Sequence, residues 1–276
     1  MTASVSGASE RRACKTLGVA RWTARPSITQ PPFAPLREDL VERLAFLIQQ
    51  HPTYGYRRLG VLLRCRDGLK VNRKAVYRIL KVKGWMVHQR TCTPRPRVQG
   101  SISRSSRSDE RWATDLTHIP VGRDGWAHLA AVIDCHDRVL IGHEFSLRGR
   151  AREAERALEN ACLLRFGTLR PDGPTPVLRS DNGLVFQSRR FRAACHDYRL
   201  SQEFITPYTP EQNGMIERFF RSLKEECIWQ HNFQSFDEAK KTIDAWIRYY
   251  NEERPHQSLG YLSPHQYRAQ QLNQVA

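Results

Sequence analysis

Apolar residues recur at helical spacing in the first third of the chain. After Leu36, leucine and isoleucine occupy positions 40, 44, 47 and 48 until a His-Pro pair stops the pattern, and this spacing predicts one helix. A second helix is predicted to follow residues 54–58 and to run to about 64. A third begins after Asn72, whose side chain suits an N-cap, and ends at Gly84. The first third therefore predicts a small all-α unit.

The third predicted helix has one apolar and one basic face. Three short helices, the last amphipathic and basic, are typical of a helix-turn-helix domain whose recognition helix enters the major groove of DNA. A solvated basic face on a small helical bundle is the alternative interpretation. The apolar face is predicted to consist of Ala75, Val76, Ile79, Leu80 and Val82. The DNA-binding candidates are Arg57 and Arg58, directly before the second predicted helix, and Arg73, Lys74, Arg78 and Lys81 of the third.

Two segments of different composition flank this helical domain, which we place at residues 36–87. Residues 1–30 contain two brief helical stretches around a Leu-Gly-Val turn and are predicted to form a short helix-turn-helix segment. Residues 88–110 are rich in proline, serine and arginine and lack apolar periodicity, so we expect an extended basic linker. Such a linker either lies along a phosphate backbone or serves as a plain tether.

Strand-like and helical patterns alternate in the last part of the chain, residues 111–276. Three strands, a helix and then shorter strands predict an α/β fold, with a mixed sheet flanked by helices in the order of a ribonuclease-H-like domain. C-terminal helices are expected to complete this domain. Strands are predicted at 112–119, 127–133, 139–145, 176–178 and 203–205, and helices at 150–166, 191–198 and 236–250.

Charge is distributed unevenly over the 276 residues. The formal net charge is +16, which favours a polyanionic partner such as nucleic acid. Residues 1–110 carry 22 basic and 7 acidic side chains, whereas residues 111–276 carry 22 and 21. We therefore expect the first part of the chain to hold DNA or RNA, and the second part to use its carboxylates.

The sequence predicts neither a membrane protein nor a disulfide-stabilised one. No apolar stretch reaches the ~18 residues of a membrane-spanning helix, and the N-terminus lacks the apolar core of a secretory signal. The seven cysteines are scattered singly, without a CxxC pair, which is typical of reduced thiols. We therefore expect a cytoplasmic protein.

Three acidic residues are candidates for metal-assisted chemistry on a phosphodiester. Two divalent ions about 3.5–4 Å apart neutralise the developing charge and align the attacking oxygen, and carboxylates are their natural ligands. Asp115 lies in the first predicted strand, and Asp181 follows the fourth at an Asn-Gly turn. Glu217 lies on a helix predicted to begin with Thr209 as its N-cap, or a few residues later because of the Asn213-Gly214 pair. Arg221 and Lys224 follow Glu217 at i+4 and i+7. For each acid alone, a solvated face with an ion pair is the alternative.

Three motifs around these acids resemble those of the DDE transposase and retroviral integrase superfamily. They are WATDLT at 112–117, SDNG at 180–183 and PEQNGMIERFFRSLKEE at 210–226, with 35 residues between the second and third acids. Three further stretches, HPTYGYRRL, VNRKAVYRIL and YYNEERPHQSLGYLSP, resemble the second-reading-frame (OrfB-type) proteins of insertion sequences of the IS-three family. The resemblance extends from about residue 9 to residue 267.

This resemblance implies a transposase, a metal-dependent polynucleotidyl transferase that cleaves and joins DNA strands at the ends of an insertion element. It implies that Asp115, Asp181 and Glu217 are catalytic and hold two Mg²⁺ ions, for which Mn²⁺ would substitute. In this part of the chain, the resemblance implies three DNA contacts, namely Asn182, Arg221 and Lys224.

The resemblance also implies partners. These are double-stranded DNA, from both element ends and target, and a first-reading-frame protein, present separately or as a frameshift fusion. A homo-oligomer on DNA, in the bacterial cytoplasm and bound to the nucleoid, is expected. Two other functions stay open at this point: a non-catalytic DNA-binding regulator of transposition, and a nuclease of the same fold that hydrolyses without joining.

Overall fold

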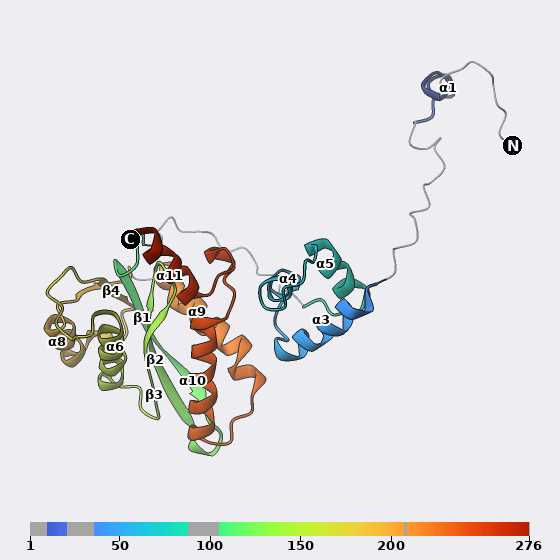
Figure 1. Ribbon diagram of the computed structural model, residues 1–276. Helices are drawn as coiled ribbons and strands as arrows, with labels where there is room; N and C mark the ends of the chain where they lie inside the picture. Colours follow the sequence, from blue (N-terminus) through green and yellow to red (C-terminus); the bar gives the residue numbers. More distant parts are fainter. Residues whose placement is uncertain (1–9, 21–35, 88–104, 207–208, 276) are drawn as a thin grey trace. The chain divides into compact units, whose positions relative to one another are not determined.

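The computed structural model describes residues 10–20, 36–87, 105–206 and 209–275 (Figure 1). The chain divides into two compact units, Met1–Leu44 and Ala45–Ala276. Helix α1 (Glu10–Thr16) belongs to the first unit; much of the predicted N-terminal segment and most of the predicted linker lie outside the described residues. Among the residues that are described, no helix is both long and apolar enough to span a membrane.

The three helices predicted in residues 36–87 are confirmed. Leu44 and Leu47, which the periodicity of the first helix indicated, are fully buried, as are Leu59 and Leu63 of the second helix. Helices α4 and α5 pack against each other. The bounds are Glu38–Gln50 for α3, Tyr56–Cys65 for α4 and Arg73–Val82 for α5.

Local sequence explains where α5 begins and ends. The Oδ1 atom of Asn72 accepts a hydrogen bond from the backbone N–H of Lys74 at 2.9 Å, as an N-cap does. Gly84 follows the helix with a φ of +71°, which glycine adopts without steric cost. The buried face comprises Val76, Ile79 and Leu80. The prediction that Val82 belongs to this face is wrong: Val82 is the last residue of the helix and is 60% exposed.

A five-stranded mixed sheet forms the centre of the second unit, in the order β3-β2-β1-β4-β5. Strands β1, β2 and β3 pair antiparallel, whereas β4 pairs parallel with β1 and β5 parallel with β4. This confirms the predicted sheet, and each strand lies within about three residues of its predicted range. The bounds are Arg111–Pro120 for β1, Trp126–Asp134 for β2, Leu140–Ser146 for β3, Val177–Ser180 for β4 and Ser201–Phe204 for β5.

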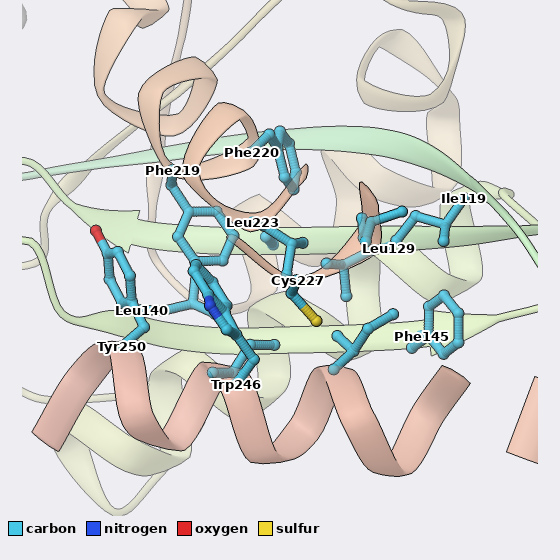
Figure 2. Close-up of a cluster of buried hydrophobic side chains, with 14 of the residues drawn as sticks. Ile119, Leu129, Leu140, Phe145, Phe219, Phe220, Leu223, Cys227, Trp246 and Tyr250 are labelled. Carbon is cyan, nitrogen blue, oxygen red and sulfur yellow. The ribbon is translucent and has the colours of Figure 1, made fainter. Parts of the chain in front are cut away.

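Helices cover both faces of the sheet, so there are two apolar cores (Figure 1). Helices α6 (Ala151–Phe166), α7 (Leu184–Gln187) and α8 (Arg189–Asp197) cover one face. Helices α9 (Gly214–Glu226) and α10 (Phe236–Glu252) cover the other, and Figure 2 shows the aromatic rings of both helices lying against the strands. Helix α7 was not predicted from the sequence, and the terminal helix α11 (Pro264–Val275) was expected only as one of the C-terminal helices, without bounds.

Two close approaches fix β3 against its neighbours. At Gly142 a Cβ atom would lie 2.1 Å from the carbonyl oxygen of Ala157, so α6 packs directly on the strand backbone. On the other side, the side-chain amide of Asn251 in α10 accepts a hydrogen bond from the N–H of Leu140 and donates one to its carbonyl, both at 2.9 Å. β3 is an edge strand, so this amide takes the place of a neighbouring peptide group.

Helix α9 begins at the later of the two predicted starts, at the Asn-Gly pair. Residues Pro210–Asn213 form a single 3-10 turn, and the α-helix starts at Gly214. Thr209 was predicted as the N-cap, but its hydroxyl donates to the carbonyl oxygen of Thr206 instead of accepting from the helix. The Asn-Gly pair explains the delay, because both residues favour turns over the first turn of a helix.

Candidate active site

Asp115 and Asp181 lie side by side on parallel neighbouring strands. The register of β1 and β4 pairs Ala113 with Arg179, and each aspartate is two residues further along its own chain. Asp115 is in the middle of β1, while Asp181 directly follows β4. The sheet therefore brings together the two aspartates that the motifs singled out.

One backbone N–H orients each of these carboxylates. Oδ1 of Asp115 accepts from the N–H of Leu116 at 2.7 Å, and Oδ1 of Asp181 accepts from the N–H of Gly183 at 2.9 Å. A Cβ atom at Gly183 would lie 2.9 Å from that same Oδ1, so the glycine of the SDNG motif leaves room for the carboxylate. The structure gives no hydrogen bond from the described residues to either Oδ2, which keeps one oxygen of each aspartate for a ligand.

Asn182 has a structural contact within this turn. Its Nδ2 donates to the carbonyl oxygen of Ile205 at 2.9 Å, and its own carbonyl accepts from Nε2 of Gln187 at 2.7 Å. The residue thus joins the turn after β4 to the end of β5 and to α7. Its predicted contact with DNA stays a prediction.

Glu217 lies in the first turn of α9, on the exposed side of that helix. Ile216, Phe219, Phe220 and Leu223 form the buried side, as the helical spacing predicted. Arg221, which shares the exposed side, forms an i,i+4 ion pair with Glu225 at 2.8 Å. The helix therefore presents Glu217 beside a basic side chain, although Arg221 already has an acidic neighbour.

The pKa of Asp115 depends on burial and on the charges of the two other acids and of Lys224. Its pKa is raised to about 7, mainly by burial and also by the charges of Asp181 and Glu217, against the N–H of Leu116 and the charge of Lys224, which lower it. Burial and the charge of nearby Glu211 also raise the pKa of Glu217. When burial and neighbouring carboxylates raise the pKa of a carboxyl group, a bound cation stabilises its ionised form most strongly.

The donor set fits a hard divalent metal ion. Carboxylate oxygens are the ligands that Mg²⁺ prefers, and Mg²⁺ keeps several waters and binds substrate phosphates as well as one or two protein carboxylates. Among the described residues, no three His, Cys, Asp or Glu side chains converge on one point.

A buried arginine that the sequence analysis did not single out connects β4 to α9. Arg179, two residues before Asp181, is 2% exposed. Its Nε and Nη2 donate to the two carboxylate oxygens of Glu203 in β5, both at 3.1 Å, and its Nη1 donates to the carbonyl oxygen of Gln212 at 2.9 Å. Gln212 lies in the 3-10 turn from which α9 starts. Arg179 therefore ties the helix that carries Glu217 to the strand that carries Asp181.

A second buried arginine holds the opposite end of α9. Arg254 donates to both carboxylate oxygens of Glu226, at 2.7 and 2.6 Å, and to the hydroxyl of Ser222 at 3.2 Å. Burial opposes ionisation of Glu226, but the hydrogen bonds and charges of Arg254 and Arg58 lower its pKa below the usual value. Arg254 belongs to the YYNEERPHQSLGYLSP motif. The resemblance of this motif to a known family was the only feature of the sequence that indicated a role for Arg254.

The DNA-binding candidates of the helical domain lie on α4 and α5. Arg57 is exposed, and its Nε donates to the hydroxyl of Tyr56 at 3.2 Å. Arg58 is half-buried and donates to Glu226 at 3.0 Å, so part of its charge is offset. On α5, the exposed candidates are Arg73, Lys74 and Lys81, and Arg78 is half-buried.

Family models match three parts of the chain. An integrase core domain model matches residues 105–210, which include Asp115 and Asp181, and a second one matches residues 198–264, which include Glu217. An HTH-like domain model matches residues 35–91. The chain thus combines a DNA-binding fold with an integrase core.

Two relatives come from insertion elements of bacteria. An uncharacterized 39.2 kDa protein of insertion element IS476 from Xanthomonas euvesicatoria is 32% identical, over 96% of this chain and 75% of the relative. The putative transposase InsK of insertion sequence element IS150 from Escherichia coli is 31% identical, over 84% of this chain and 83% of the relative.

The fold is shared with a solved integrase assembly. The structure of the simian T-cell lymphotropic virus intasome in complex with PP2A regulatory subunit B56 gamma matches with a TM-score of 0.50 and 18% identity, over 81% of this chain and 73% of that chain. At that identity the likeness concerns the ribonuclease-H-like fold. The relatives and the integrase core matches show that the chain belongs to the family of insertion-element transposases with an integrase core, which are polynucleotidyl transferases.

Proposed function

We propose that Asp115, Asp181 and Glu217 are the catalytic carboxylates, and that they hold two Mg²⁺ ions during DNA strand cleavage and strand transfer at the ends of an insertion element. The observation that carries this proposal is the parallel register of β1 and β4, which sets the two aspartates side by side. The raised pKa of Asp115 supports it, because the charge of Glu217 contributes to that shift. When bound, the ions would neutralise phosphate charge and activate the attacking oxygen.

Cleavage and joining are two in-line displacements at phosphorus. In the first, the oxygen of water attacks a phosphodiester at the element end, the bond from phosphorus to the 3′ oxygen breaks, and a 3′-hydroxyl is released. In the second, that hydroxyl attacks a phosphodiester of another strand, whose own 3′ oxygen leaves. Each step forms one phosphorus–oxygen bond and breaks one, so joining requires no nucleotide cofactor.

The residues of the chain have separate tasks in these steps. Asp115 and Asp181 each present one oxygen, with the other held by a backbone N–H. Lys224, whose charge reaches Asp115, would bind the substrate phosphate and orient it for attack. Glu217 would complete the ligand set when DNA is bound.

A strand-transfer assay tests this assignment. Purified full-length protein is incubated with labelled element-end DNA and Mg²⁺, beside the variants Asp181→Asn and Asp172→Asn. Asp172 is a matched control because it is a fully exposed aspartate outside the site. We expect joined products with the wild type and Asp172→Asn, and a loss of at least a hundredfold with Asp181→Asn.

Other outcomes contradict the proposal in distinct ways. Binding without cleavage, in Mg²⁺ or Mn²⁺ and with the first-frame protein added, would indicate a non-catalytic regulator. Cleavage without joining would indicate a nuclease. Unchanged joining by Asp181→Asn would show that Asp181 is not a catalytic residue.

We infer further that the protein works on double-stranded element-end and target DNA, as a homo-oligomer and with a first-reading-frame partner or fusion. The HTH-like match and the exposed basic residues of α5 support the DNA part. Joining that rises at least tenfold when the first-frame protein is added, together with a larger complex in light scattering on DNA, is the expected result. Full activity of a monomer alone would contradict it.

A further inference from the structure

Two sequence motifs that the proposed function leaves unexplained contact each other or the same helix end in the structure. HPTYGYRRL covers the start of α4, and YYNEERPHQSLGYLSP contains the end of α10. The hydroxyl groups of Tyr54 and Tyr249, one from each motif, share a hydrogen bond at 2.6 Å. Arg58 of the first motif donates to Glu226 at 3.0 Å. Both contacts lie within the second compact unit, which contains α4, α5 and the integrase core. We call this contact the docking interface; it consists of His51, Tyr54, Arg58, Glu226, Tyr249 and Arg254.

Aromatic rings form one half of the docking interface. His51 stacks on Tyr54, with ring centroids 4.7 Å apart, and on Tyr249, with ring centroids 5.5 Å apart. A cavity of about 160 Å³ remains beside these rings, lined in part by residues 50–54 and by Trp246. Because side chains do not fill this space, the contact depends on a few specific groups and not on continuous apolar packing. Loss of one hydroxyl or one guanidinium group should therefore weaken it.

A carboxylate shared by two arginines forms the other half. The Glu226 side chain is 9% exposed, and both of its oxygens accept from Arg254, at 2.7 and 2.6 Å. Arg58 is a second donor to this carboxylate, and its guanidinium group also lies 4.9 Å from the centre of the Tyr54 ring. Since Arg254 already neutralises Glu226, removal of Arg58 leaves no unpaired buried charge in the core. We therefore expect Arg58 to matter for the contact between α4 and the core, and little for the fold of the core itself.

The docking interface lies on the helix that carries Glu217. Glu226 is the last residue of α9, and Glu217 lies in its first turn, about 13 Å away at about 1.5 Å per residue. Arg179 holds the start of the same helix to the sheet. Helix α4, and α5 packed on it, are thus connected to the proposed catalytic site through one rigid element. A flexible linker limits only how far apart two parts of a chain can lie, whereas a docked contact fixes their separation.

We propose that the docking interface sets the distance between the DNA that α5 holds and the phosphodiester that is cut at the carboxylates. This inference rests on the proposed function and adds the contact that aligns DNA recognition with cleavage. Arg58 is then a positioning residue and not the DNA contact that the sequence indicated: its side chain is 30% exposed, and Glu226 and Tyr54 engage its guanidinium group. Cutting at one phosphodiester requires a fixed separation, because a misplacement of about 1 Å already removes most of the rate of an in-line attack.

The position of the cut tests this proposal. Full-length protein is incubated with Mg²⁺ and an end-labelled duplex that carries the element end, and the cut phosphodiesters are mapped at nucleotide resolution. The variants are Arg58→Ala and Tyr249→Phe, the second of which removes only a hydroxyl group of α10. We expect the wild type to cut at one phosphodiester. In both variants the share of cuts there should fall by about half or more, with new cuts at neighbouring phosphodiesters. Their affinity for the duplex should stay within about twofold of the wild type, since the DNA contacts of α5 are intact.

Arg64→Ala is the matched control, because Arg64 is an exposed arginine of the same helix whose Nε donates to the carbonyl oxygen of Gly60, one turn earlier. It should cut where the wild type cuts. If Arg58→Ala lowers the melting temperature, Tyr249→Phe decides the question. A single cut position in a folded variant of the interface overturns the proposal, as does equal spreading of cuts in Arg64→Ala. A large loss of affinity in Arg58→Ala with an unchanged cut position also overturns it and makes Arg58 a DNA contact.

A distance measurement without metal or DNA separates this inference from the proposed function. Spin labels are attached to Cys65, which is exposed at the end of α4, and to Lys241→Cys on α10, in a Cys92→Ser background; the other described cysteines are buried. Double electron–electron resonance should give one narrow distance distribution with the intact interface and a broad one when both interface substitutions are present. Equally narrow distributions overturn the docking. If the wild type does not cut, or cuts without the aspartates, the proposed function fails, while the distance distribution still decides whether α4 is docked.

Discussion

Gly183 illustrates how much a single residue constrains the site. It follows Asp181 by two positions, donates its N–H to that carboxylate, and leaves the space in which the carboxylate lies. Its φ is −63°, an ordinary value for any residue, so the need for glycine here is one of space and not of backbone conformation.

Gly183→Ala should therefore impair chemistry more than stability. A Cβ atom 2.9 Å from Oδ1 of Asp181 must displace that carboxylate, and displaced ligands typically cost about 10–100-fold in metal affinity or activity. We expect a loss of that size in joining, measured with labelled element-end DNA, and a melting temperature close to that of the wild type.

Gly173→Ala is the control for this substitution. Nothing lies within 4 Å of a Cβ atom at Gly173, so this variant should join DNA normally. Normal joining by Gly183→Ala would show that the carboxylate is free to move aside without loss.

At the scale of elements, helix α9 depends on contacts from outside itself for its position. Its first turn carries Glu217, and the preceding 3-10 turn is held by Arg179 through the carbonyl of Gln212. The same guanidinium group is bound by both oxygens of Glu203. Strand β4, strand β5 and helix α9 are thus connected through one side chain.

Arg179→Lys should loosen this connection while keeping the charge. A lysine ammonium pairs with Glu203 but lacks the planar fork that spans both Glu203 and Gln212. We expect Mn²⁺ binding, measured by electron paramagnetic resonance, to weaken about tenfold, within the range for residues that orient metal ligands. DNA binding through the helical domain should be unchanged.

Arg111→Lys provides the comparison, because Arg111 also pairs with Glu203, at 3.4 Å, but has no contact with Gln212. Equal weakening in both variants would mean that the charge near Glu203 matters and the connection to α9 does not.

Most elements of this fold follow from periodicity, and the exceptions have physical reasons. Strand β2 is a nearly continuous apolar run, and helices α3, α5, α6 and α10 have apolar faces, so their bounds were predicted closely. Helix α7 has only four residues, too few for a helical period to show. Helix α11 contains few apolar residues and is largely exposed or half-buried, which leaves no amphipathic pattern to detect.

The residues of the candidate site likewise fall into those that the sequence predicted and those that it did not. The three acids were found through motifs, and the structure places two of them side by side. Arg179 was missed because an arginine next to a polar stretch indicates an exposed position when only neighbours in sequence are considered. Its burial depends on Glu203 and Gln212, which are 24 and 33 residues away, and only the folded sheet brings them together.

At the scale of the whole molecule, burial of neutral and charged groups couples stability to pH. His256 has a pKa of about 2 in the folded protein, mainly because of burial and then because of Arg254, against about 6.5 when unfolded. Its contribution to stability is therefore complete above pH 6.5 and is lost as the pH falls below that value. Each pH unit between 6.5 and 2 shifts the folding equilibrium about tenfold toward the unfolded state.

His256→Gln should remove this sensitivity. Between pH 7 and pH 5, the folding equilibrium of the wild type should fall roughly 25-fold more than that of the variant, as measured by urea unfolding. The variant is expected to be less stable at pH 7, since it loses a packed ring that contacts Tyr250. His196→Gln, at a side chain that is 92% exposed, should behave as the wild type; equal pH profiles for all three proteins would contradict the assignment.

The side-chain amide of Asn251, bound to both backbone groups of Leu140, has a consequence for self-association. Edge strands with free peptide groups are templates for pairing with other sheets, and proteins protect them in order to stay dispersed. In this fold a residue of α10 occupies two of those groups on β3, so the helix that completes the core also shields the sheet from aggregation.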